Sequence, residues 1–249
     1  MTKFAIAATV ILMSAQFASA ADLSPAKWAP EARQRAEKQE VTSWTPLAAQ
    51  TIRGKGGMIS ATVSPIAIEA GLETLRQGGN AADAAASVAL TQVTTQLGSV
   101  VSYAGIMTML YYDSKTGKVS SLDAGYNSYR GESDPRSIPQ CDLSLLTGGP
   151  EPPPATDLGR QTLVPGFMAG IEAMHARFGH MAFGDLFAPA IWYADNGVTI
   201  SPSLAYLFHV RQKSFSRTPE GERFLHQAGN DLPQSGDVFR QPDLAATLR

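Results

Sequence analysis

The segment from Ser64 to Leu97 (SPIAIEAGLETLRQGGNAADAAASVALTQVTTQL) constrains the fold most, because it predicts two helices joined by a tight corner. Ser64 is suited to cap the first helix, and Pro65 fits its first position, where no amide donor is needed. The apolar positions recur at helical spacing. They predict one buried stripe, made of Ile68, Leu72 and Leu75.

The corner between the two helices is specified by short-range chemistry. Gly78 and Gly79 can adopt the left-handed conformation that ends a helix, and Asn80 with Asp83 matches a capping box. Asp83 is therefore interpreted as a helix-capping residue. The second helix consists almost entirely of Ala, Val and Leu, which suits a position inside a layered domain. Periodicity alone is satisfied equally well by two ordinary core helices of any α/β protein.

Composition excludes several classes of partner. The chain has 249 residues, of which 44% are hydrophobic and 17% charged, an ordinary balance for a globular protein. Its net charge of −2 and the absence of a Lys/Arg-rich run argue against nucleic acid or a membrane as the main partner. The four histidines lack metal-ligand spacing. We therefore expect a small polar substrate, no metal and no cofactor.

The amino terminus predicts export. Lys3 precedes an apolar run, and Ala18, Ser19 and Ala20 are the small residues expected before a signal-peptidase cut, so residues 1–20 are interpreted as a signal peptide. The competing interpretation, a membrane anchor, needs about 20 apolar residues, and this run is shorter. A periplasmic or secreted protein is expected. Cys141, the only cysteine, forms no internal disulfide and lies in a proline-rich loop with no adjacent histidine, so no catalytic role is expected.

The chain divides into an arm and a domain. We interpret residues 21–56 as an N-terminal arm that is partly helical over 31–40. We interpret residues 57–249 as a domain that is truncated at its C-terminus. The domain is expected to open with a strand over 57–63, before the helix pair. Later come a strand over 105–113, a turn at 114–117 and a returning strand over 118–123.

The second half of the domain is predicted to be mainly helical. Proline density from Ser133 to Gly159 predicts a long surface loop without regular elements. This loop is interpreted equally well as a functional lid or as an insertion. Helices are expected over 167–178 and 189–195, and from Ser201 onward. Residues 241–249 resemble the first turns of a helix that continues, so we expect a longer natural protein.

Five blocks, taken in order, resemble one family. They are GMISATVSPIAIEAGLETLRQGGNAADAAASVAL, YYDSKTGKVSSLD, VPGFMAGIEAMHARFG, FAPAIWYADNGVTISPSLA and QPDLAATLR. Together they resemble, over residues 57–249, the large-subunit part of γ-glutamyltransferases.

The resemblance implies an α+β fold of the Ntn-hydrolase type. This is a four-layer αββα sandwich, which would be incomplete in these 249 residues. The resemblance also implies a precursor that cleaves itself into large and small subunits, so that the small subunit would be a partner of this chain.

The activity implied by the resemblance is transfer of a γ-glutamyl group from glutathione or a related donor to water or an amino acid. The family's nucleophile is a threonine at the start of the small subunit, with its own amine as base. That threonine is expected beyond Arg249, so no catalytic residue is assigned within this chain.

Two departures from the family pattern fall where the donor would be recognised. The family carries an arginine shortly after the aspartate that ends the hairpin, but here Asp123 is followed by Ala124, Gly125 and Tyr126. A guanidinium is the natural ligand of a carboxylate, and tyrosine does not replace it. The candidate substrate-binding residues are Tyr126 and the downstream Arg130, for which a solvated loop residue is the favoured interpretation. Asp123 is interpreted either as a site-positioning or as a hairpin-capping residue.

The second departure concerns the segment before the second strand. The family has a glycine-rich run there, whereas Ser99 to Gly105 reads SVVSYAG and keeps only Gly105 of the cluster. Close approach of the backbone to a ligand is then harder. Two alternatives to a γ-glutamyltransferase therefore stay open: an Ntn acylase acting on other amides, and a non-catalytic family member that acts as a binding protein.

Overall fold

The computed structural model describes residues 21–42, 56–61, 63–99, 101–138, 159–227 and 231–249. The predicted signal peptide, Cys141 and most of the proline-rich loop lie outside these residues. Within the described residues, none of the helices has both the length and the apolar composition needed to cross a bilayer.

The described chain is mainly helical, with two small sheets, and the fold is α+β. The α-helices are α1 (Pro30–Thr42), α2 (Pro65–Arg76), α3 (Ala81–Thr95), α4 (Phe167–Phe178), α5 (Ala188–Asn196), α6 (Pro202–Phe215), α7 (Pro219–Leu225) and α8 (Pro242–Leu248). The strands are β1 (Met107–Asp113), β2 (Lys118–Ala124), β3 (Val198–Thr199) and β4 (Val238–Phe239). Short 3₁₀ turns are η1 (Pro25–Lys27), η2 (Pro135–Ser137), η5 (Gly159–Gln161) and η6 (Phe183–Phe187). These bounds confirm the predicted helices over 31–40, 167–178 and 189–195, and those that follow Ser201 and Gln241.

The α2–α3 corner has the predicted capping chemistry. Ser64 Oγ accepts a hydrogen bond from the amide of Ala67 at 3.2 Å. At the turn, Gly78 has φ of +94°. Asn80 Oδ1 accepts from the Asp83 amide at 3.1 Å, while Asp83 Oδ2 accepts from the Asn80 amide at 2.9 Å, completing the capping box.

The buried face of α2 differs from the predicted stripe. Ile68, Leu72 and Leu75 are only half-buried. The face that is buried carries Ile66, Ala67, Ala70 and Thr74. Ile66 and Ala70 pack with Trp28 of the N-terminal arm and Tyr193 of α5. The prediction was wrong because the arm and α5, rather than a sheet, cover this helix.

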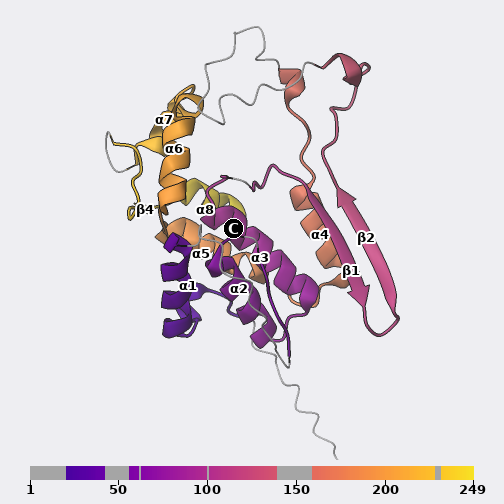
Figure 1. Ribbon diagram of the computed structural model, residues 1–249. Helices are drawn as coiled ribbons and strands as arrows, with labels where there is room; N and C mark the ends of the chain where they lie inside the picture. The colour runs from indigo at the N-terminus through magenta and orange to yellow at the C-terminus, as the bar shows by residue number, and fades with distance from the viewer. Residues whose placement is uncertain (1–20, 43–55, 62, 100, 139–158, 228–230) are drawn as a thin grey trace, which may run out of the picture.

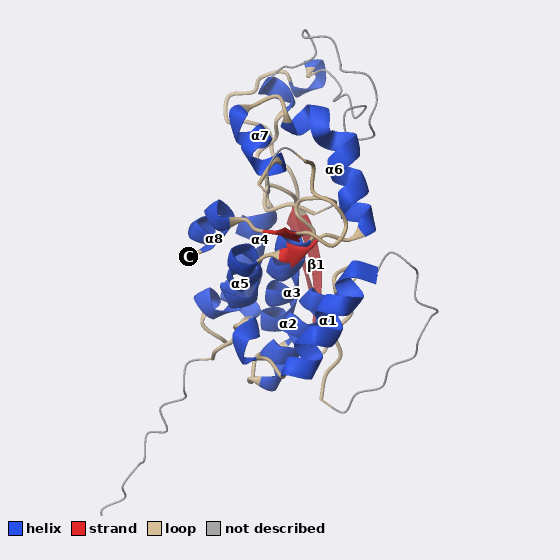
Figure 2. Ribbon diagram, turned by 90° about the vertical axis from the view of Figure 1, so that its left-hand side faces the viewer, coloured by secondary structure: helices blue, strands red, loops and turns tan. Residues whose placement is uncertain are grey.

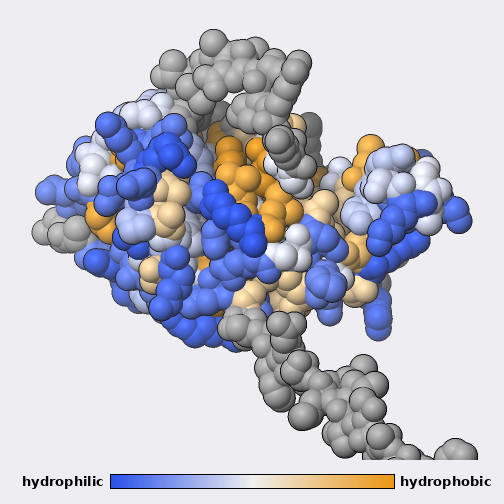
Figure 3. All heavy atoms as spheres, turned by 90° about the horizontal axis from the view of Figure 1, so that it is seen from below, coloured by the Kyte–Doolittle hydropathy of each residue, from blue (hydrophilic) through white to orange (hydrophobic). Residues whose placement is uncertain are grey.

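The predicted strand over 57–63 is also wrong for the described residues 57–61 and 63, which form no strand. A strand requires a neighbour for its backbone hydrogen bonds, and the described chain offers none beside this segment. The segment instead lines one side of a groove of about 600 Å³, together with Leu75 and Val88. From below, Figure 3 shows hydrophobic side chains gathered between the helical body and the hairpin.

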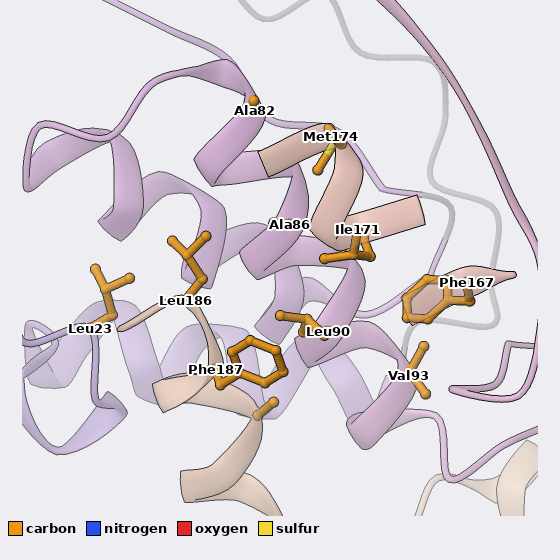
Figure 4. Close-up of a cluster of buried hydrophobic side chains, with 11 residues drawn as sticks. Leu23, Ala82, Ala86, Leu90, Val93, Phe167, Ile171, Met174, Leu186 and Phe187 are labelled. Atoms are coloured by element: carbon orange, nitrogen blue, oxygen red, sulfur yellow. The ribbon is translucent and has the colours of Figure 1, made fainter. Parts of the chain in front are cut away.

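The largest hydrophobic cluster surrounds α3. Figure 4 shows Ala82, Ala86, Leu90 and Val93 of α3 facing residues of α4 and the η6 region. Their partners include Phe167, Ile171, Met174, Leu186 and Phe187. Leu90 of α3 and Leu186 of η6 are fully buried, and α3 contacts α2, α4, α5 and η6, so it forms the centre of the described chain.

Strands β1 and β2 form an antiparallel hairpin that lies beside α4 (Figure 1). The turn has the predicted left-handed residue, since Gly117 has φ of +68°. One face packs on α4, where the rings of Tyr111 and Phe178 stack with centroids 4.1 Å apart. The other face is open: Leu110 is 79% exposed, and Tyr112 lies opposite Val119 on the same face.

A buried carboxylate attaches the N-terminal arm to the corner. Glu40, at 3% exposure, accepts hydrogen bonds from Ser64 Oγ at 3.0 Å, from the Ile66 amide at 3.1 Å and from Gln96 Nε2 at 2.8 Å. Burial raises the pKa of Glu40 above its usual value, while these hydrogen bonds oppose that rise. The end of α1 is therefore fixed to α2 and α3 by a polar network.

Helices α6 and α7 stand apart from α1, α2 and α3, as Figure 2 shows. They have a hydrophobic cluster of their own, built from Ile200, Leu204, Phe208, Leu225 and Phe239 with Leu97 at the end of the corner. The 3₁₀ turn Pro135–Ser137 lies within the segment predicted to lack regular elements, because a proline suits the first position of such a turn.

Candidate functional site

A pocket of about 380 Å³ opens where α3 ends and the chain crosses toward β1. We call it the loop pocket. Its lining comes from α3, the described residues of the 98–106 segment (98–99 and 101–106), the position two residues after β2, the start of α4, and α6. These residues are Ala89, Gln92, Val93, Gly98, Ser99, Val101, Ser102, Gly105, Ile106, Tyr126, Phe167 and Arg211.

The 98–106 segment is held against α3 by Tyr103. The Tyr103 hydroxyl donates to the Leu90 carbonyl at 2.8 Å and shares a second hydrogen bond of 2.8 Å with Thr94 Oγ1. Burial raises the pKa of Tyr103 to about 12, so the hydroxyl stays protonated at neutral pH. The chain enters this segment through Leu97 and Gly98, whose φ values are +51° and +70°. The loop is thus anchored by a neutral tyrosine.

Close backbone contacts bring the end of β2 to the same place. The Gly105 carbonyl accepts from the amides of Gly166 and Phe167 at 3.1 and 3.0 Å. A Cβ atom at Gly166 would overlap the carbonyl oxygens of Ala124 and Gly125, so only glycine fits there. The two segments in which the sequence departs from the family pattern therefore meet at the loop pocket.

The candidate substrate-binding residues occupy different positions. Tyr126 lines the loop pocket and is 52% exposed. Arg130 is exposed and is not among the lining residues, and it makes no hydrogen bond or ion pair with another described residue. Asp123 lies on the open face of β2, opposite Thr108, and is not a lining residue either. Of these three, the structure brings only Tyr126 to the pocket.

Sequence reasoning did not identify Arg211, which lines the pocket from α6. Its Nη1 donates to the Ser99 carbonyl at 2.9 Å, and its Nε is buried without a hydrogen-bond partner in the part of the chain that the structure describes. Arg211 follows Leu204 by seven residues and Phe208 by three, on the buried stripe of the helix. A cation on an apolar stripe was the signal available in the sequence.

The carboxylate of Asp83 binds backbone amides after α4, with His175 beside it. Asp83 is fully buried, and besides capping α3 its carboxylate accepts from the amides of His180 at 2.9 Å and Met181 at 3.3 Å. His175 Nε2 lies 3.0 Å from the Met181 carbonyl and 3.4 Å from Asp83 Oδ1. No cluster of three or more His, Cys, Asp or Glu suited to a metal ion occurs among the described residues. The capping role predicted for Asp83 is confirmed.

Comparisons with known proteins agree with the resemblance found in the sequence. The family model described as gamma-glutamyltranspeptidase matches residues 67–249. The chain is 32% identical to the glutathione hydrolase proenzyme of Bacillus subtilis (strain 168) over 199 residues, which cover 79% of this chain and 32% of the relative. It is 28% identical to the capsule biosynthesis protein CapD proenzyme of Bacillus anthracis over 186 residues, covering 74% of this chain and 30% of that protein.

A solved structure supports the same assignment. The crystal structure of Helicobacter pylori gamma-glutamyltranspeptidase superposes with a TM-score of 0.67 and 26% identity, over 80% of this chain and 54% of that chain. The present chain spans about a third of the length of the curated relatives it matches. Because the family model matches most of the chain, the protein belongs to the gamma-glutamyltranspeptidase family.

Proposed function

We propose that this chain is the N-terminal portion of an exported enzyme that transfers a γ-glutamyl group from glutathione or a related donor to water or an amino acid. The observation that carries this proposal is the family match over residues 67–249, which include every residue lining the loop pocket. In this proposal residues 1–20 are a removed signal peptide and residues 21–56 are an arm on the domain.

The proposed chemistry uses a threonine that follows residue 249 in the natural protein and becomes the N-terminus of a small subunit. Its amine takes the proton from the hydroxyl, and the hydroxyl oxygen attacks the donor's amide carbon. Backbone amides stabilise the oxyanion, the C–N bond breaks, and the leaving amine takes up the proton. Water or an amino acid then attacks the resulting ester, releasing product and the threonine. This chain contributes the scaffold and part of the donor pocket.

The open surfaces of the structure are consistent with the four-layer sandwich proposed for the complete protein. The hairpin carries exposed Leu110, Tyr112 and Val119 on one face, and the stripe of α2 at Leu72 and Leu75 is half-buried. Apolar surface of this kind is normally covered by another layer. In the proposed fold, the strands of the small subunit extend the hairpin into a larger sheet.

The residues at and beside the loop pocket also allow a donor other than a γ-glutamyl compound. Gly125 and Tyr126 stand where a carboxylate-binding arginine was expected, and the 99–105 segment keeps only Gly105 of a glycine run. An Ntn acylase acting on other amides is therefore the second candidate function. A relative named for capsule biosynthesis is consistent with a variation of task within the family.

The test uses the natural full-length protein. We expect it to separate into two subunits on standing and to hydrolyse a γ-glutamyl anilide faster than a simple acyl anilide. The 249-residue chain alone is the control, and it should give no turnover because the nucleophile lies outside it. Cleavage with preference for the acyl anilide would support the acylase. A protein that stays uncleaved and inactive would contradict both enzymes and favour a binding role.

A further inference from the structure

Arg211 gives the loop pocket an unbalanced positive charge. It is the one charged side chain among the described residues that line the pocket, whose other members are apolar, hydroxyl, amide or glycine residues. No described carboxylate forms an ion pair with it within 4.0 Å. A guanidinium stays protonated at all physiological pH values, so the pocket carries a permanent cation.

The position of this guanidinium is fixed by the protein. Nη1 is held by the Ser99 carbonyl at 2.9 Å, and Leu97, Leu207 and Phe208 lie beside the same side chain in the small void next to the pocket. One bond to a carbonyl uses one of the five N–H donors of an arginine. Within the described chain the buried Nε has no hydrogen-bond partner, and Nη2 donates to no described residue, so the guanidinium keeps donors that its protein surroundings leave unused.

We propose that Arg211 binds the α-carboxylate of the donor's glutamyl group in the loop pocket and so determines the donor specificity. This proposal rests on the proposed function. A carboxylate is the anion whose two oxygens match the planar fork of a guanidinium, and such a pair is stronger than a neutral hydrogen bond. The pocket volume of about 380 Å³ suits a ligand of amino-acid size. Val93, Val101 and Phe167 offer apolar contact to its methylene chain.

Arg211 reaches the pocket from a different element than the residues that follow β2. It comes from α6, while the neutral Tyr126 lines the pocket from the end of the hairpin and the cationic Arg130 does not line it. The bond to Ser99 also ties the arginine to the 98–106 segment. The segment that lacks the glycine run therefore has a role of its own, which is to hold the carboxylate-binding side chain.

A purely structural arginine would join α6 to Ser99 and do nothing more. The two roles differ in what a ligand without an α-carboxylate experiences. If Arg211 only supports the loop, its loss weakens all ligands alike. If it binds the carboxylate, its loss weakens L-glutamate and leaves 4-aminobutyrate, which lacks the α-carboxylate, nearly unchanged.

The experiment measures the affinity of L-glutamate and of 4-aminobutyrate for the natural full-length protein by calorimetry. We expect the wild type to bind glutamate about 10-fold to 100-fold more tightly, the range that a charge-assisted hydrogen bond supplies. Arg211→Gln should remove this difference, and Arg211→Lys should restore part of it. Lys213→Gln, an exposed cation two residues further along α6, is the matched control and should leave the difference intact.

The outcomes separate the two proposals. Equal affinities in the wild type, or a preference for glutamate that survives Arg211→Gln, would overturn the role of Arg211. If Arg211→Gln does not fold, as judged by circular dichroism, Arg211→Lys takes its place, and a preference for glutamate that is unchanged in Arg211→Lys would overturn the role. Turnover of the γ-glutamyl anilide is measured on the same samples. Activity with an unchanged preference refutes only this inference, whereas glutamate binding without subunit cleavage or turnover refutes only the proposed enzyme.

Discussion

The α2–α3 corner and the β1–β2 hairpin both form around short turns that the local sequence specifies, but the rest of the chain covers them very differently. In the corner, Asn80 and Asp83 satisfy each other's amides, and Leu90 is fully buried among α4 and η6. In the hairpin, Tyr111 packs on α4 while Leu110 and Tyr112 on the opposite face are open.

The comparison indicates that the corner contributes most to the stability of the fold, whereas the hairpin has an exposed apolar face. The side of the corner around Leu90 is fully packed within the described chain, so changes there should be costly. The hairpin is stabilised through one face only, so changes on the open face should be tolerated. The loop pocket lies between the two regions, because the 98–106 segment connects α3 to β1. One side of the pocket is therefore formed by the well-packed helix α3, and the other side, near Tyr126, is more exposed to solvent.

The largest effect is expected from a cavity in the corner. Leu90→Ala should lower the free energy of unfolding by about 2–5 kcal/mol, because a fully buried leucine leaves a cavity that neighbours only partly fill. Urea unfolding followed by circular dichroism measures it. The matched change Val119→Ala, on the open face of β2, should cost far less. Equal losses would contradict the distinction between the two regions.

A smaller loss is expected from the buried carboxylate of the corner. Asp83→Asn places an amide donor where the carboxylate accepts from the backbone of Asn80, His180 and Met181, and it should cost about 2–3 kcal/mol. The hairpin control is Asp113→Asn, whose carboxylate accepts from the Lys115 amide in solvent. Thermal unfolding of both variants checks this. A hairpin variant as destabilised as Asp83→Asn would refute the expectation.

The third effect depends on pH. Because burial raises the pKa of Glu40, the folded state favours its protonated form. The contribution of Glu40 to stability is therefore fully present below the usual glutamate pKa and is lost as pH rises through the raised value. Unfolding free energies from pH 4 to 8 should show the wild type losing stability relative to Glu40→Gln as pH rises.

The control for this pH series is Glu31→Gln, which removes an exposed carboxylate from the same helix. Its difference from the wild type should stay nearly flat over the same range. A difference for Glu40→Gln that is independent of pH would show that the buried carboxyl keeps an ordinary pKa in the folded protein.

The smallest effect is expected on the open face of the hairpin. Leu110→Thr replaces a side chain that is 79% exposed with a residue well suited to strands, so stability should change by no more than about 0.5 kcal/mol. Solubility of the 249-residue chain should rise, because an exposed apolar side chain is removed. Destabilisation by more than about 1 kcal/mol would mean that this face is covered.

Features governed by neighbouring residues were predictable from the sequence. The Ser64 cap, the Asn80–Asp83 capping box and the helix over Phe167–Phe178 were all confirmed, because each depends on atoms a few residues apart. The turn at Gly117 was predictable for the same reason.

Features that depend on distant partners were not predictable in the same way. The strand over 57–63 needs a neighbouring strand to form. The buried face of α2 differs from the predicted one because the arm and α5 pack on Ile66 and Ala70. Of the pocket, the 99–105 segment and Tyr126 could be selected from the family pattern. Arg211 could not, because it reaches the pocket from α6, more than a hundred residues after Ser99.

The most direct test of the pocket as the donor site is a crystal structure of the natural full-length protein with L-glutamate bound. We expect the α-carboxylate to lie within hydrogen-bond distance of the Arg211 guanidinium, about 2.7–3.2 Å, beside Phe167 and Val101. Glutamate bound with both carboxylates away from the loop pocket, for example on Arg130, would contradict it.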